Sequence, residues 1–429
     1  MRIVLRFLRI PVRSHFVVLY KISKTVNQRY LSLDVLRGGT VAFMILVNNP
    51  GTWSHTFGPL EHAYWHGLTP TDLVFPFFLF AVGNAMAFVI PRLRKEGDAV
   101  FWKKVVTRTV LILLIGTFLN WFPFSHWVDD ELIFRGWEWT QADGTMGGIR
   151  VLGTLQRIAI CYFFASILVY YFKPRTVMIL SGLILMAYWV LCMVMNPDDP
   201  FSFNGWFGKQ IDLDVFGAAH VYRGDGIPFE NEGLVSTLPA IVQVLLGFLV
   251  GDFIRRRSSR SEGKQDESAS GKLYRTLTEL FVAAAIVLVI GYLWSLVFPI
   301  NKKIQSSSFI LVTAGLATTM LIMLVYLMEI KKITGWWSRG FLVFGRNPLF
   351  IYALSELLPR FSNLIRIPVG SVTNGQVNYV DPLEWFYQNI CAHFPGPPEA
   401  GSLFYALCIV ALYWGIGYWL DKRKLYIRV

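Results

Sequence analysis

Two histidines that could do acid–base chemistry stand in one short polar stretch, residues 61–72, between two strongly apolar segments. An imidazole titrates near neutral pH, so His62 could accept a proton from an attacking amine or hydroxyl group. The alternative is that His62 only packs or caps the loop. His62 and His66 could also bind a metal ion together, but no third ligand stands at a recognised spacing. We therefore predict an acid–base site and no metal site.

A short helix is predicted around these histidines. Pro59 suits the first position of such a helix, and Gly67 suits its end. His62 and His66 are four residues apart, so a helical turn would place both rings on the same face.

A second helix is predicted to begin directly after this turn. Thr69 suits its N-cap and Pro70 its first position. Asp72 is then the third residue, where its carboxylate can complete a capping box. Asp72 is therefore either a helix cap or a member of the site itself.

The composition is that of a membrane protein. Of the 429 residues, 54% are hydrophobic and only 16% are charged, whereas soluble domains carry roughly 25% charged residues. The mean hydropathy is +0.46. The net charge of +12 does not indicate a nucleic-acid partner, because the basic residues cluster between apolar segments. We predict an all-α polytopic membrane protein embedded in a lipid bilayer and exclude a soluble enzyme.

About ten segments approach the roughly 20 residues that a bilayer requires. They are residues 34–50, 71–90, 105–121, 151–171, 175–195, 234–254, 277–298, 308–329, 340–358 and 402–420. The loops between them alternate between basic and poor in Lys and Arg, which places both termini in the cytoplasm and the loop with His62 on the other side of the inner (plasma) membrane.

Four parts are predicted along the chain. Residues 1–30 form a basic arm at the membrane surface, and residues 31–254 form a six-helix part that carries the active-site loops. Residues 255–275 form a cytoplasmic linker, and residues 276–429 form the last four helices. The four cysteines do not suggest a disulfide framework. We find no internal repeat, so sequence symmetry does not support an inverted-repeat transporter.

Polar residues inside or next to apolar segments are further candidates, because such residues are costly in a bilayer and are often functional. Asn48 or Asn49 closes the first segment and could donate a hydrogen bond to a developing oxyanion. Arg157 could pair with Asp72 or Glu232, or bind an anionic ligand.

Several motifs follow one another from about residue 29 to residue 355. They are Arg-Tyr-Leu-Ser-Leu-Asp-Val-Leu-Arg-Gly (29–38), Met-Ile-Leu-Val-Asn-Asn-Pro-Gly (44–51), His-Ala-Tyr-Trp-His-Gly-Leu-Thr-Pro-Thr-Asp (62–72), Leu-Gln-Arg-Ile-Ala (155–159), Glu-Gly-Leu-Val-Ser-Thr-Leu-Pro-Ala (232–240), Thr-Ala-Gly (313–315) and Gly-Arg-Asn-Pro-Leu-Phe-Ile-Tyr (345–352). In this order they resemble the motifs of the heparan-α-glucosaminide N-acetyltransferase family.

The resemblance implies an acetyltransferase of the membrane. Members of that family transfer an acetyl group from cytosolic acetyl-CoA to the amino group of a terminal glucosamine on the far side of the membrane. His62 matches the family's active-site histidine, and Asn48 matches the asparagine that closes its first span. The further residues that we expect to bind the amino sugar or acetyl-CoA are Asp72, Arg157, Glu232, Asn49, Trp65, His66, Arg37 and Asn347. A homodimer is implied by the resemblance alone.

Two departures from the family's motifs concern the acceptor side. His66 stands where the family usually has Asn, and residues 230–233 read Glu-Asn-Glu-Gly where it usually has Asp-Pro-Glu-Gly. The acceptor could therefore differ from heparan glucosamine. The chain resembles a compact bacterial relative without the extra external N-terminal domain of the eukaryotic members. A sugar transporter or flippase and an O-acyltransferase of a surface polysaccharide remain as alternatives.

Overall fold

The computed structural model describes residues 30–427, apart from 129–130, 141–143, 225, 260–268 and 374–375. The predicted N-terminal arm therefore lies almost wholly outside the described residues, as does the middle of the predicted linker. The described ends of that linker are helical and extend α7 (Leu234–Ser259) and α8 (Ala269–Trp294).

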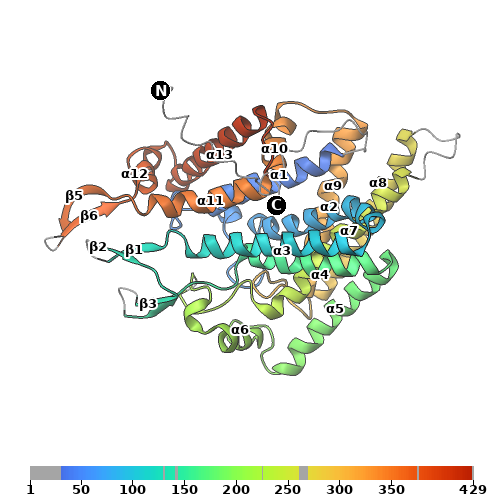
Figure 1. Ribbon diagram of the computed structural model, residues 1–429, viewed down its shortest axis with the longest axis horizontal. Coiled ribbons are helices and arrows are strands. Elements are labelled where there is room, and N and C mark those ends of the chain that lie inside the picture. The colour runs from blue at the N-terminus through green and yellow to red at the C-terminus, as the bar shows by residue number, and fades with distance from the viewer. Residues whose placement is uncertain are drawn as a thin grey trace.

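The described chain forms a bundle of long apolar helices (Figure 1). Eight helical segments are long and apolar enough to cross a membrane, and α10 with α11 makes a ninth if this bent pair is one span. The all-α polytopic architecture is thus confirmed. Besides α7 and α8, the long helices are α1 (Leu31–Asn48), α2 (Val74–Glu96), α4 (Thr154–Tyr171), α5 (Pro174–Met195), α9 (Ser307–Val325) and α13 (Pro398–Lys422).

The predicted third span, 105–121, does form a helix, α3 (Asp98–Trp121). It is not among the eight segments, so the described residues give eight candidate spans, or nine with the bent pair, where the sequence predicts about ten. Lys103, Lys104 and Arg108 lie in its first half.

Two Asn-Pro pairs end or bend the predicted spans. Asn49 has φ −129° and ψ 59°, so α1 stops at Asn48 and not at Pro50. Asn347 has a similar conformation, φ −128° and ψ 49°. There α10 (Trp336–Arg346) and α11 (Pro348–Ser362) meet at 79°. The cause is steric, because a proline ring disfavours the α conformation in the residue before it.

Glycines allow two helix pairs to pack at very close range. A Cβ on Gly83 of α2 would lie 1.9 Å from the carbonyl oxygen of Val244 in α7. Likewise, a Cβ on Gly38 of α1 would lie 1.8 Å from the carbonyl oxygen of Phe341 in α10. Small residues at such crossings bring two backbones into contact, which is how helices associate in lipid.

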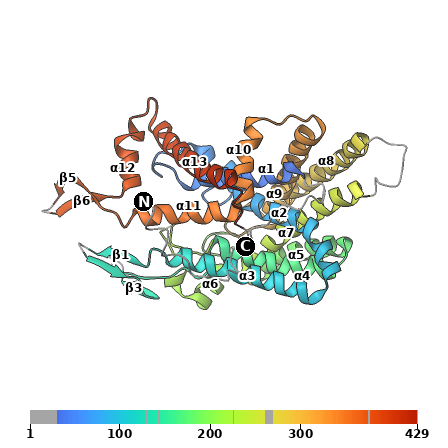
Figure 2. The same cartoon turned by 45° about the horizontal axis from the view of Figure 1, so that its top comes forward.

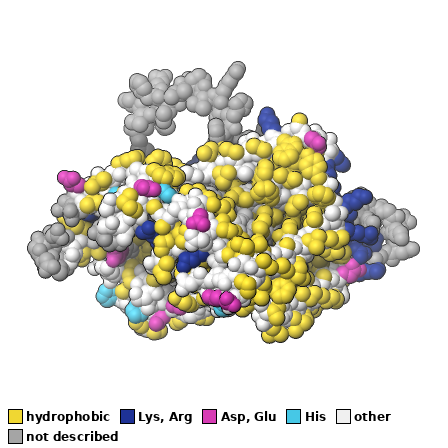
Figure 3. Space-filling view, turned by 90° about the horizontal axis from the view of Figure 1, so that it is seen from below, with side chains coloured by type: hydrophobic (Ala, Val, Ile, Leu, Met, Phe, Trp, Pro, Cys, Tyr) yellow, Lys and Arg dark blue, Asp and Glu magenta, His cyan; other side chains and the backbone are white. Residues whose placement is uncertain are grey.

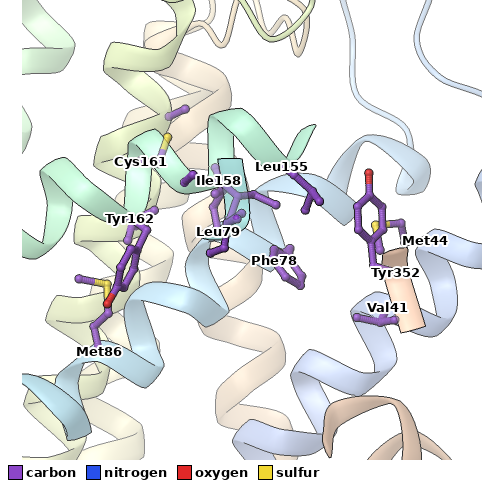
Figure 4. Close-up of a cluster of buried hydrophobic side chains, with 14 of the residues drawn as sticks. Val41, Met44, Phe78, Leu79, Met86, Leu155, Ile158, Cys161, Tyr162 and Tyr352 are labelled. Atoms are coloured by element: carbon purple, nitrogen blue, oxygen red, sulfur yellow. The ribbon is translucent and has the colours of Figure 1, made fainter. Parts of the chain in front are cut away.

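The largest hydrophobic core lies among α1, α2, α3, α4, α7, α11 and α13. Figure 4 shows Tyr352 of α11 beside Met44 and Val41 of α1, with Phe78 and Ile158 from α2 and α4 continuing the same cluster. By contrast, only 28% of the most apolar window of α5, and of α8, is buried. The side chains that α5 and α8 leave exposed include many large apolar ones, as expected for lipid-facing helices. Figure 3 shows a broadly apolar face of the molecule.

Short elements gather at one end of the bundle. Figures 1 and 2 show three antiparallel hairpins and α12 (Pro382–Asn389) projecting from the end of the bundle opposite the last turn of α7 and the first turn of α8. The hairpins pair β1 (Ser125–Val128) with β2 (Glu131–Phe134), β3 (Glu138–Thr140) with β4 (Met146–Gly148), and β5 (Ile367–Thr373) with β6 (Gln376–Val380). The remaining short elements are α6 (Gly208–Phe216), η2 (Gly58–Leu60), η3 (Pro70–Leu73), η4 (Ala218–His220), the π-helix η6 (Tyr326–Ile330) and η7 (Cys391–His393). On the face drawn in Figure 3, Lys and Arg gather mainly at the right-hand end and His towards the left.

Candidate functional site

The loop that carries His62 is not helical, so the predicted short helix is wrong. The helical turn η2 ends at Leu60, and Glu61 is already extended, with φ −92° and ψ 156°. His62 and His66 therefore do not share a helix face. The cause is the Asp72 carboxylate, whose Oδ2 accepts the backbone N–H of Ala63 at 3.2 Å. This long-range acceptor satisfies a donor that a helix would have bonded within the turn.

The capping box that was predicted for the next helix is confirmed. Thr69 is the N-cap of η3, Pro70 is its first residue, and the side chains of Thr69 and Asp72 each bond the other's backbone. The Thr69 N–H donates to Asp72 Oδ2 at 3.0 Å. Asp72 therefore holds both ends of the loop against the start of η3, which leads directly into α2.

The same carboxylate also contacts the candidate base. Asp72 Oδ1 lies 2.7 Å from Nδ1 of His62. The Asp72 side chain is 1% exposed, and that of His62 is 41% exposed. A carboxylate at Nδ1 fixes the imidazole tautomer with its proton on Nδ1, which leaves the Nε2 lone pair as the base. Asp72 therefore caps η3, as predicted, and also contacts His62, while its role in a functional site stays a prediction.

A lysine that the sequence analysis missed completes this cluster. The ammonium nitrogen of Lys302, in the loop between α8 and α9, lies 3.0 Å from Nδ1 and 3.2 Å from Nε2 of His62. It lies 3.7 Å from Oδ1 of Asp72. One signal in the sequence was available, because Lys302 and Lys303 stand together in a loop assigned to the side poor in basic residues.

His66 and Gly67 connect the histidine loop to the loop that carries Lys302. The Gly67 N–H donates to the carbonyl of Ile300 at 2.9 Å. The side-chain amide of Asn301 lies 3.4 Å from Nδ1 of His66. Burial lowers the pKa of His66, so its ring is neutral at physiological pH. A neutral ring can accept from the Asn301 amide, which gives His66 a role in positioning the loop of Lys302.

Trp65 anchors the histidine loop to an aromatic cluster. Its indole N–H donates to the carbonyl of Phe201 at 2.8 Å. Its ring meets Phe203 and Phe229 edge-on, with centroids 5.3 Å and 5.5 Å away. These contacts cover much of the ring, and Trp65 is half-buried. Only part of its side chain is therefore accessible to a substrate.

A second charged cluster lies beside the first. Arg150 binds both Glu230 and Glu232, and its Nε donates to Oε2 of Glu230 at 3.0 Å. The Glu230 side chain is fully buried and also accepts the N–H of Tyr222 at 3.1 Å. Arg157 instead donates to the carbonyl of Gly233, at 3.2 Å, and to Ser236. Arg157 was predicted to pair with Asp72 or Glu232, or to bind an anionic ligand, and among the described residues it donates no hydrogen bond to either carboxylate.

Charges connect the two clusters. Burial opposes the ionisation of Glu232, but the charges of Arg150, Arg157 and Lys302 outweigh it and lower the pKa of Glu232. Burial raises the pKa of Glu230 despite the neighbouring Arg150. Glu232 therefore carries the stable negative charge of this cluster, and Lys302 lies within its field.

Asp212 lies next to this cluster and carries one carboxylate oxygen without a partner in the described part of the chain. Its Oδ1 accepts the N–H of Leu234 at the start of α7, at 2.9 Å, while the buried Oδ2 has no hydrogen bond. A Cβ on Gly233 would lie 1.8 Å from that Oδ2. Burial raises the pKa of Asp212 to about 7.

Asp212→Asn should make the protein more stable at pH 8 than the wild type, with a smaller difference at pH 5. Folding raises the pKa of Asp212, so the protonated carboxyl contributes fully to folding stability below the unfolded pKa of about 3.9. This stability is lost as pH rises through about 7, where the buried carboxyl must ionise, and Asn avoids that loss. The measurement is the melting temperature in detergent at both pH values. Asp214→Asn, on the exposed side of α6, is the control. A difference that does not change with pH would contradict the prediction.

Asn48 and Asn49 stand at the C-terminal end of α1. Asn48 is exposed, and among the described residues no hydrogen bond joins it to His62. Neighbouring residues of α1, including Val47, line a shallow cleft with Leu60 and Ser402. Asn49 donates its amide to the carbonyl of Ile45 at 2.9 Å and so caps its own helix.

Arg37 and Asn347 lie at the other end of α1. Arg37 donates to the carbonyl of Gly345 at 2.9 Å and to Asp34 at 2.6 Å. Eleven residues of helix, at about 1.5 Å each, separate Arg37 from Asn48 by roughly 16 Å along the axis. The side chain of Asn347 accepts the N–H of Ile427 at 2.8 Å and donates to the carbonyl of Leu425 at 3.0 Å. The structure thus divides the predicted site residues between the two ends of the bundle.

Among the described residues, no group of three or more His, Cys, Asp or Glu side chains is arranged to hold a metal ion. The four cysteines are free, and three of them are buried. The groups that the first cluster brings together are the His62 imidazole, the Asp72 carboxylate and the Lys302 ammonium.

Comparison with known proteins supports the resemblance drawn from the motifs. No family model matches the chain. Human heparan-alpha-glucosaminide N-acetyltransferase is 23% identical over 385 residues, which is 78% of this chain and 53% of the human protein. The mouse protein of the same name is 22% identical over 386 residues, again 78% of this chain and 54% of its own length. The chain spans about half the length of these curated relatives, and this similarity identifies it as a distant relative of the heparan-α-glucosaminide N-acetyltransferases.

Proposed function

We propose that this protein is a transmembrane N-acetyltransferase. It moves an acetyl group from cytosolic acetyl-CoA to the amino group of glucosamine or a glucosaminide on the extracytoplasmic side. The observation that carries the proposal is the hydrogen bond between buried Asp72 and accessible His62, 2.7 Å long, in a chain whose curated relatives are named as N-acetyltransferases.

In the direct route, Nε2 of His62 accepts a proton from the acceptor amine, whose nitrogen attacks the thioester carbonyl carbon. A C–N bond forms, the C–S bond breaks, and the CoA thiolate leaves and takes up the proton. In the covalent route, Nε2 attacks the thioester carbon, the C–S bond breaks and the CoA thiolate leaves. The amine then attacks the acetyl-imidazole, the C–Nε2 bond breaks, and the amine proton passes to the released Nε2. In both routes Asp72 holds the ring and stabilises the positive charge that develops on it.

The two ends of the bundle suggest how the substrates are arranged. The basic end, with Arg37 and Asn347 nearby, would receive the nucleotide of acetyl-CoA, and the pantetheine would pass between helices towards His62. At the other end, Glu232 and Arg157 would bind the amino sugar, with Asn48 and Trp65 at the border of the site. Both termini would then be cytoplasmic in an inner (plasma) membrane. The homodimer stays a prediction.

Purified protein in detergent, given acetyl-CoA and glucosamine, should release one free thiol for each acetylated amine formed. The thiol is measured with a colorimetric reagent and the product by mass spectrometry. N-acetylglucosamine, whose amine is blocked, is the control acceptor and should give no thiol above the background of water. A sugar transporter or flippase would release no thiol with either sugar. An O-acyltransferase would release thiol with both.

A further inference from the structure

The position of the Lys302 ammonium group is defined by the imidazole more than by a carboxylate. Its nitrogen is 3.0 Å and 3.2 Å from the two ring nitrogens of His62 but 3.7 Å from Asp72. The N–H of Nδ1 and the lone pair of Nε2 point in diverging directions, so one atom cannot lie along both. Lys302 Nζ therefore lies against the ring, between Nδ1 and Nε2, and its N–H groups are available to a third partner.

A reacting carbonyl would meet this ammonium group. Whichever route is followed, the thioester carbonyl must come next to Nε2, because Nε2 either takes the proton from the amine or attacks the carbon. Nζ lies 3.2 Å from that nitrogen. An oxygen on the same carbonyl would therefore be within hydrogen-bond distance of an ammonium group whose side chain is only 26% exposed.

We propose that Lys302 is a catalytic residue that stabilises the oxyanion of the tetrahedral intermediate. This inference rests on the proposed acetyl transfer. When nitrogen attacks, the C=O electron pair moves onto oxygen, and the Lys302 ammonium donates a hydrogen bond to it. When the pair returns, the C–S bond breaks and the thiolate leaves, and Lys302 keeps its proton throughout. From the sequence, Asn48 or Asn49 was predicted for this role, but Asn48 has no hydrogen bond to His62 among the described residues.

Two opposing effects act on the charge of Lys302: acidic neighbours favour its protonated form, and burial disfavours it. Burial lowers the pKa of Lys302, and the charge of Lys303 acts in the same direction. Asp72 and Glu232 oppose this shift. His62 is the remaining titratable group against it. A cation in a site poor in water interacts more strongly with a developing oxyanion than a solvated one does.

The test compares Lys302→Met, Lys302→Arg and Lys303→Met with the wild type. Removing one oxyanion donor lowers kcat by about 10² to 10³, so Lys302→Met should lose about 100-fold in kcat with less than about a threefold change in the KM for acetyl-CoA. Lys302→Arg should recover at least about tenfold of that loss. Lys303→Met should keep the wild-type kcat at pH 7, where Lys302 is protonated in both proteins, because the Lys303 ammonium lies over the Tyr64 ring at 5.8 Å.

The pH profile of kcat separates catalysis from a merely structural role. The alkaline limb of the wild type should lie below the ordinary lysine value of about 10.4, because burial lowers the pKa of Lys302. In Lys302→Arg this limb should move to higher pH, since a guanidinium stays charged. Binding of CoA alone, measured by calorimetry, should be the same in Lys302→Met and the wild type.

Each outcome supports or overturns the proposed role of Lys302. Lys302→Met with kcat within threefold of the wild type would overturn the inference, as would an alkaline limb that stays in place in Lys302→Arg. If Lys302→Met does not fold, the limb of Lys302→Arg decides alone. If the wild type retains acetyl transfer and only these results fail, the proposed function stands and the role of Lys302 falls. If the wild type transfers no acetyl group to any amine, both are overturned.

Discussion

His62→Ala should reduce acetyl transfer by about 10³-fold or more while the protein stays folded. A general base typically contributes 10² to 10⁴-fold, and an acyl carrier at least as much. The side chain is 41% exposed, so its loss removes little packing. The measurement is the transfer of labelled acetyl from acetyl-CoA to glucosamine, at saturating concentrations of both, by protein in detergent.

His55→Ala is the matched control for this variant, because His55 is an exposed imidazole in the same loop. It should transfer acetyl at the wild-type rate. Retained transfer by His62→Ala at near that rate would end the proposal that this imidazole does the chemistry. A melting temperature that falls in His62→Ala would point to a packing role for the ring, which was the alternative left open by the sequence.

Local rules predicted part of this site and long-range contacts defined the rest. The capping box of Thr69 and Asp72 was predictable because its bonds join residues three apart. The helix through His62 and His66 did not form, because Asp72 offers the Ala63 N–H an acceptor from nine residues away. Such competition between a helical turn and a distant carboxylate leaves no mark on hydrophobic periodicity.

The residues that were missed are separated from their partners by much larger distances along the chain. Lys302 meets His62 across 240 residues, and Arg150 meets Glu230 across 80. A single sequence shows each as a polar residue in a loop and does not show which loops meet. The membrane spans were predictable for the opposite reason, because a bilayer imposes length and hydropathy on each helix separately.

The division of the predicted residues between two ends follows from helix geometry. Arg37 and Asn48 belong to one helix, and its rise fixes their separation whatever their chemistry. Asn48 was predicted to donate to the oxyanion and Arg37 to bind substrate or acetyl-CoA, and both were candidates because polar groups near spans are often functional. That rule identifies such residues without saying which of them meet. The candidate residues were therefore predicted as one group, whereas the structure separates them into two groups at opposite ends of the bundle.

Arg150→Met should destabilise the protein by about 3–5 kcal/mol, because removing one partner of a buried ion pair leaves an uncompensated charge. Arg150 lies between Glu230, which is fully buried, and Glu232, which is 17% exposed. Without its guanidinium, two carboxylates would face each other in a site poor in water. The measurement is the thermal unfolding of both proteins in the same detergent, followed by circular dichroism.

Two comparisons distinguish this electrostatic cause from a loss of packing. Arg223→Met, which removes a surface arginine that donates to the carbonyl of Ala218 at 3.2 Å, should leave the melting temperature nearly unchanged. Lowering the pH from 8 to 5 should reduce the defect of Arg150→Met. The pKa of Glu230 is already raised by burial, and without Arg150 it should rise further, so this carboxyl takes up a proton and the repulsion disappears. A defect that is equal at both pH values would assign the role of Arg150 to its packing over the Tyr222 ring, 4.9 Å away, instead of to its charge.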